Sequence, residues 1–73
     1  MMLDNMKKML TDLYIQYYES EEGTPKEYRA NGAISAIKQL LRAEYGRENA
    51  REIITESAKK AKYIVFGDEN FKL

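Results

Sequence analysis

The chain has 73 residues and contains neither cysteine nor histidine. The lack of cysteine excludes disulfides and thiol nucleophiles, and the lack of both residues removes the ligands of the usual zinc sites. Histidine is also the commonest general base in enzymes. We therefore predict that the protein is not an enzyme and has no cofactor, no metal and no small-molecule substrate. A pair of Ser35 or Ser57 with a lysine is conceivable as a nucleophile, but a domain this short has little volume for a pocket.

The chain also has no net charge, because its 12 basic and 12 acidic side chains cancel. Such a chain has no overall field that would attract nucleic acid or an anionic membrane surface. The charge is nevertheless uneven: residues 1–22 hold two basic and five acidic groups, whereas residues 23–47 hold five basic and two acidic groups. A polyanion would therefore have to contact the middle of the chain.

No apolar run approaches the length of about 20 residues that a transmembrane helix needs. At the N-terminus, Asp4 and Asn5 stand where an export signal would have its apolar core. We therefore expect a cytoplasmic protein that does not contact a membrane.

Hydrophobic residues make up 44% of the chain and charged residues 33%, a balance typical of a soluble helical domain. Apolar residues recur every three or four positions, which is the period of an amphipathic helix. The stripe nearest the N-terminus consists of Leu3, Met6, Leu10, Leu13, Tyr14 and Tyr17. We predict one all-α domain over residues 1–73, a small three-helix bundle with helices at about 3–18, 25–45 and 48–66.

The middle helix has the clearest start and stop signals. Thr24 can cap its first turn, Pro25 suits the first helical position, and Gly46 supplies the left-handed residue that commonly ends a helix. Asn31-Gly32 is a turn signal inside this segment, so the helix is either continuous or broken at that point into a short and a longer helix. Its predicted buried stripe consists of Ala30, Ala33, Ile34, Ile37, Leu41 and Tyr45, with Leu40 at the margin.

The third helix carries a stripe rich in small residues, which allow helix axes to approach closely. This stripe consists of Ala50, Ile53, Ile54, Ser57, Ala58, Ala61, Ile64 and Val65. Residues 63–66 are β-branched and aromatic, so they form either a strand or the last turn of the helix; we favour the helix, ended by Gly67. Residues 67–73 are predicted to form a partly ordered tail, with Phe71 and Leu73 able to pack back onto the bundle.

Six tyrosines and four methionines point to contacts with other macromolecules. Tyrosine is favoured at interfaces because it buries a large ring while its hydroxyl stays in water, and a bundle this short cannot enclose six of them. A core of this size also leaves only about 3–5 kcal/mol of net stability, which favours oligomerisation. We predict a homo-oligomer, most simply a dimer, with Tyr14, Tyr17 and Tyr18 in self-association.

The outer side of the middle helix is the best candidate surface for a partner, and we expect that partner to be another protein. The predicted partner-binding residues are Tyr28, Asn31, Ser35, Lys38, Gln39 and Arg42. The predicted function is that of a non-catalytic protein-binding or regulatory module. Its size, its lack of cysteine and its bias toward lysine, glutamate, asparagine and tyrosine are reminiscent of accessory proteins of phages and bacterial mobile elements, many of which modulate one host protein.

The alternative is a small helix-turn-helix-like regulator that binds DNA through the middle helix. Lys38, Gln39 and Arg42 would then lie in a groove of the duplex. The zero net charge speaks against this alternative, because phosphate neutralisation supplies most of the binding free energy of such proteins. Nucleic acid is therefore a less favoured partner than protein.

Overall fold

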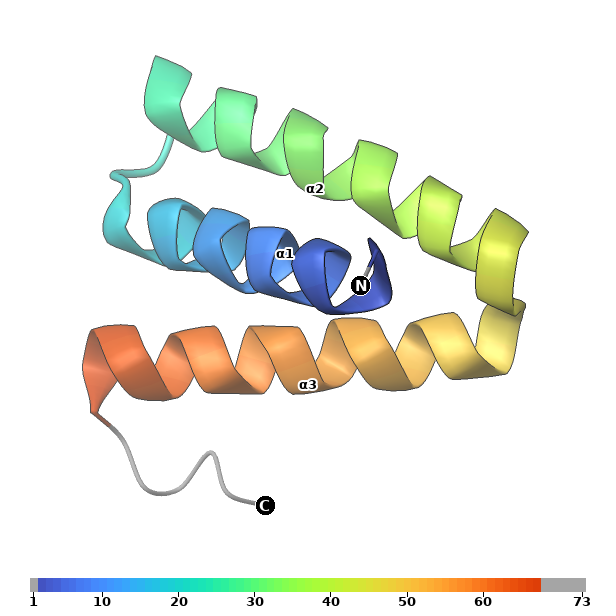
Figure 1. Cartoon of the computed structure of the whole chain (residues 1–73). Coiled ribbons are helices and arrows are strands. Elements are labelled where there is room, and N and C mark those ends of the chain that lie inside the picture. Colours follow the sequence, from blue (N-terminus) through green and yellow to red (C-terminus); the bar gives the residue numbers. More distant parts are fainter. Residues whose placement is uncertain (1, 68–73) are drawn as a thin grey trace.

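The computed structural model describes residues 2–67 and consists of three helices: α1 (Met2–Glu19), α2 (Pro25–Tyr45) and α3 (Arg47–Phe66) (Figure 1). Helices α1 and α3 run in the same direction, α2 runs in the opposite direction, and each helix contacts the other two. The predicted all-α three-helix bundle is confirmed, and no observed helix end lies more than one residue from its predicted position. None of these three helices has an apolar stretch that could span a bilayer.

Helix α2 begins where Thr24 and Glu27 satisfy free N–H groups. The Thr24 hydroxyl accepts a hydrogen bond from the Glu27 N–H (3.3 Å), and the Glu27 carboxylate accepts one from the Gly23 N–H (3.0 Å). In a standard capping box the carboxylate would instead bind the N–H of the capping residue, so here it reaches one residue further back. Pro25 occupies the first helical position, as predicted.

The middle helix continues without a break through Asn31 and Gly32, so the alternative of two shorter helices is wrong. Gly32 has no positive φ, and a Cβ added there would meet no atom within 4 Å. A glycine in a helix costs about 1 kcal/mol relative to alanine. The cap and the buried side of a 21-residue helix outweigh that cost.

A single residue, Gly46, separates α2 from α3. Its positive φ of 84° suits a reversal of the chain, and its N–H donates to the Arg42 carbonyl (3.0 Å). Its ψ of 163° lies outside the left-handed helical region, so the predicted left-handed conformation of Gly46 is wrong although the predicted helix end is correct. Helix α3 continues through residues 63–66 and ends at the left-handed Gly67, whose N–H donates to the Tyr63 carbonyl (2.8 Å). The strand alternative for residues 63–66 is therefore wrong. The predicted tail beyond Gly67, with Phe71 and Leu73, lies outside the described residues.

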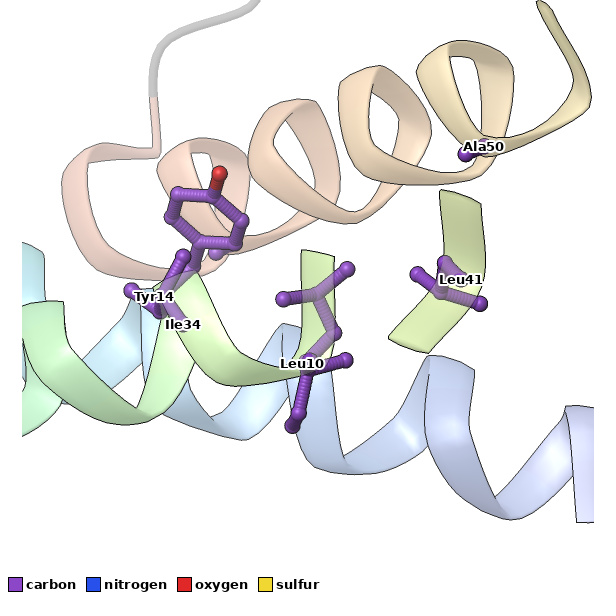
Figure 2. Close-up of a cluster of buried hydrophobic side chains, with 7 residues drawn as sticks. Leu10, Tyr14, Ile34, Leu41 and Ala50 are labelled. Atoms are coloured by element: carbon purple, nitrogen blue, oxygen red, sulfur yellow. The ribbon is translucent and has the colours of Figure 1, made fainter. Parts of the chain in front are cut away.

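The core lies where the three helices meet, and Leu10 of α1 and Leu41 of α2 are its largest fully buried side chains (Figure 2). The buried cluster consists of Leu10, Tyr14, Ile34, Ile37, Leu41, Ala50 and Ala61. Helix α3 contributes only alanines to this cluster, which lets it lie close to its neighbours. Ile64 was predicted on the buried stripe but is 57% exposed, so the apolar stripe of α3 extends beyond the part that its neighbours cover.

Candidate binding surfaces

The predicted partner-binding residues lie together along one flank of α2, because they follow each other at helical spacings of three and four residues. We call this surface the polar flank; it consists of Tyr28, Asn31, Ser35, Lys38, Gln39 and Arg42. All six are exposed except Lys38, which is half-buried. Tyr28, at one end, is 66% exposed, so its ring is available to a partner.

At its C-terminal end the polar flank meets a hollow between α2 and α3. This basic hollow has a volume of about 460 Å³ and is lined by Lys38, Arg42, Arg47, Arg51, Ile54 and Thr55. The residues that sequence reasoning missed are Arg47 and Arg51. The position of Gly46 could have predicted them. A chain reversal at this single residue places the last turns of α2 beside the first turns of α3, where Arg47 and Arg51 lie.

Four cations surround the basic hollow without a counter-charge. Within residues 2–67, the side chains of Lys38, Arg42, Arg47 and Arg51 form no ion pair and no hydrogen bond, and no carboxylate lines the hollow. Solvent weakens the mutual repulsion of these charges but does not abolish it. An anion bound between them would remove this repulsion.

A second hollow lies between α1 and α2, on the other flank of α2. This apolar groove has a volume of about 430 Å³ and is lined by Met9, Asp12, Leu13, Gln16, Ala33, Ala36 and Ile37. Met9 is 54% exposed, and the equally exposed Leu40 lies one turn beyond Ala36. The groove thus combines small alanines with long, flexible apolar side chains at its edge. Sequence reasoning placed Leu40 at the margin of the buried stripe and did not identify this groove.

The three tyrosines predicted to act in self-association lie near the end of α1 but differ in exposure. Tyr14 is only 8% exposed and belongs to the core, so its ring is not available to a second chain. Tyr17 and Tyr18 are half-buried. The centroid of the Tyr18 ring lies 5.8 Å from that of Tyr14, 5.5 Å from that of Tyr17 and 5.9 Å from that of Phe66. Burial, and then the neighbouring Tyr14 and Tyr17, raise the pKa of Tyr18 above its ordinary value of 10.0.

The other positions considered for chemistry are dispersed. Ser35 is exposed on α2, whereas Ser57 is buried in α3. A third hollow, of about 330 Å³, lies between α1 and α3 and carries charges of both signs: Asp4, Lys7, Lys8, Thr11, Asp12 and Lys60. In the part of the chain that the structure describes, no three acidic side chains are placed to hold a metal ion.

Judged by their chemistry, the basic hollow suits an anion and the apolar groove suits apolar side chains of another chain. In comparisons with known proteins, no family model, no curated protein and no solved structure matches the chain.

Proposed function

We propose that this chain is a non-catalytic, cytoplasmic binding module that works as a homodimer and presents the polar flank to a partner that it regulates. The distribution of apolar side chains carries this proposal. Among residues 3–67, whose burial the structure describes, only Leu10 and Leu41 are large and fully buried, whereas six large apolar or aromatic side chains are 48–66% exposed: Met9, Tyr28, Leu40, Tyr63, Ile64 and Phe66. Each half-exposed side chain would gain roughly 1 kcal/mol on being covered.

The apolar groove is the surface that best fits a second copy of the chain. A two-fold interface must be self-complementary, because the same patch serves both partners. The groove meets this condition, since it places a hollow floored by Ala33 and Ala36 next to the projecting side chains of Met9 and Leu40. The zero net charge also means that two copies do not repel each other.

Tyr17 and Tyr18 support self-association less strongly than the groove. Their rings already contact each other, and Tyr18 also contacts Phe66 within the same chain, with Lys62 Nζ 5.6 Å from its ring centre. A dimer through the groove would leave the polar flank free, because the two surfaces lie on opposite flanks of α2. Such a molecule could regulate one target in the manner expected of an accessory protein.

The helix-turn-helix alternative has less geometric support. In that motif, two helices are joined by a turn of about three to four residues and cross at a steep angle. The second helix of the motif enters the groove, so α2 would have to form the motif with α1. Residues 20–24 join these two helices, which lie side by side in opposite directions and do not cross steeply (Figure 1). We therefore do not propose that α2 inserts into the major groove of DNA.

Sedimentation velocity at tens of micromolar tests the dimer against the monomer mass of 8.5 kDa. We expect twice that mass for the natural chain and the monomer mass for Ala36→Glu, which places a carboxylate in the apolar groove. Ser35→Glu is the matched control, because Ser35 is a small, exposed residue of α2 next to Ala36 in the chain but lies on the polar flank, outside the groove. A natural chain that sediments as a monomer would overturn the dimer, and an Ala36→Glu variant that remains dimeric would overturn this interface.

A further inference from the structure

The basic hollow has the composition of a phosphate site. Three of its four cations are arginines, whose planar guanidinium groups match the oxygens of a phosphate in a two-pronged contact. The hydroxyl of Thr55 adds a neutral donor to the lining. The site is therefore more selective for an oxyanion than a scattered set of lysines would be.

The start of α3 adds free N–H groups beside this hollow, and the carboxylate of Glu48 in the same turn offsets part of their positive potential. Gly46 provides no side-chain cap, and the first hydrogen bond of the helix runs from the Ala50 N–H to the Gly46 carbonyl (3.0 Å). The N–H groups of residues 47–49 therefore have no partner within the helix. Arg47 stands at this positive end of the helix dipole and lines the hollow.

The polar flank extends the hollow into a longer track. From Arg42 the track passes Lys38, Ser35 and Asn31 at spacings of three and four residues and ends at Tyr28. The distance from residue 28 to residue 42 is roughly 20 Å along the helix axis. An isolated phosphate would use only the hollow, whereas a strand with successive phosphates and bases would use the whole track. Single-stranded nucleic acid is bound by such a combination of cations that follow the backbone and an aromatic ring on which a base stacks.

We propose that the basic hollow binds backbone phosphates of a single-stranded nucleic acid and that Tyr28 stacks on one of its bases. This inference deepens the proposed function, from which it takes the polar flank as the recognition surface. The zero net charge confines the attraction to this local site, so binding is weak at physiological salt and depends strongly on ionic strength.

Fluorescence anisotropy with a labelled single-stranded oligonucleotide of mixed sequence tests the proposal. Neutralisation of four phosphates predicts a slope of about −2.8 for log affinity against log salt, or a roughly fifty-fold loss between 50 and 200 mM salt. Arg42→Glu with Arg47→Glu should lower affinity by at least about tenfold and flatten the slope. Lys8→Glu with Lys26→Glu is the matched control: it changes net charge equally at two exposed lysines outside the hollow and should keep the natural slope.

The stacking step has its own pair of variants. Tyr28→Ala should weaken binding to the single strand by about tenfold, and Tyr63→Ala, which removes another exposed tyrosine, should not. Circular dichroism of each variant verifies that it is folded.

Binding of duplex DNA and of a phosphorylated peptide is compared with binding of the single strand, because each could supply the phosphate. The proposal fails if the natural chain does not bind the single strand at low salt. It also fails if the Arg42/Arg47 variant binds normally, if duplex DNA of the same sequence binds more tightly, or if only a phosphorylated peptide binds. The oligomeric state of the natural chain, measured beside its strand binding, keeps the two proposals separable. If the natural chain binds the strand as a monomer, the dimer alone is overturned. If it is a dimer that does not bind the strand, this inference alone is overturned.

Discussion

Leu40 and Leu41 are consecutive residues of α2 in opposite environments. Leu41 is fully buried between the helices, whereas Leu40 is 54% exposed near the apolar groove. Leu41→Ala should lower the free energy of unfolding by about 2–5 kcal/mol, because it leaves a cavity in a very small core. Leu40→Ala, at low protein concentration, should lower it by less than about 0.5 kcal/mol. Urea unfolding followed by circular dichroism measures both values.

The two variants control for each other, since the same substitution at adjacent positions of one helix changes helix propensity equally. Equal losses of stability would show that the core is not centred on Leu41. A loss for Leu40→Ala that grows with protein concentration would instead place Leu40 in the dimer interface.

Helical periodicity separates these two leucines but does not determine every burial. The 3.6-residue period places Leu41 inside and Leu40 at the edge without knowledge of any neighbour. Ile64 has an equally favourable position on its stripe but is 57% exposed. Tyr14 shows the opposite case: it was predicted for an interface but is enclosed within its own chain. Exposure depends on which element lies opposite, and a single stripe does not contain that information.

Glycine has different roles inside α2 and at its end. Gly32 is helical with open space at its missing Cβ, whereas Gly46 has a φ of +84° that side chains rarely adopt. Gly32→Ala should therefore raise the free energy of unfolding by about 1 kcal/mol, and Gly46→Ala should lower it by about 1 kcal/mol or more. Chemical denaturation of the two variants against the natural chain measures both shifts.

The opposite signs make this pair of glycines informative. A destabilised Gly32→Ala variant would mean that the helix bends or breaks at Asn31-Gly32, as the turn signal alone would allow. A stabilised Gly46→Ala variant would mean that α2 and α3 can join into one longer helix, which would dismantle the basic hollow.

The limits of the helices could be predicted because their signals are local. Thr24, Pro25 and Gly46 act within a few residues of the helix ends that they specify, and the observed ends agree. The basic hollow is not local in this sense. Lys38 and Arg42 were predicted from one face of α2, but Arg47 and Arg51 join them only through the packing of α2 against α3. The sequence pattern therefore predicted the half of the site that lies on α2, and the packing of α2 against α3 supplies the other half.

At the scale of the whole molecule, the two flanks of α2 divide its chemistry. The flank toward α3 carries the cations of the basic hollow, and the flank toward α1 carries the alanines and Ile37 of the apolar groove. A dimer through the groove would bring two α2 helices together and leave two basic hollows outward. Two hollows per dimer would let one strand contact both copies, which raises the effective affinity of a weak site.

Dimerisation also predicts that thermal stability depends on protein concentration. If unfolding is coupled to dissociation, mass action stabilises the folded dimer as concentration rises, and Tm should increase by roughly 4 °C for each tenfold increase. Thermal melts followed by circular dichroism across a hundredfold range, of about 1–100 µM, measure this slope. Ala36→Glu should melt at a Tm that does not change with concentration, and Ser35→Glu, on the polar flank, should keep the natural slope. A Tm of the natural chain that does not change with concentration would mean that the bundle folds as a monomer. Met9 and Leu40 would then be exposed for contact with a different partner.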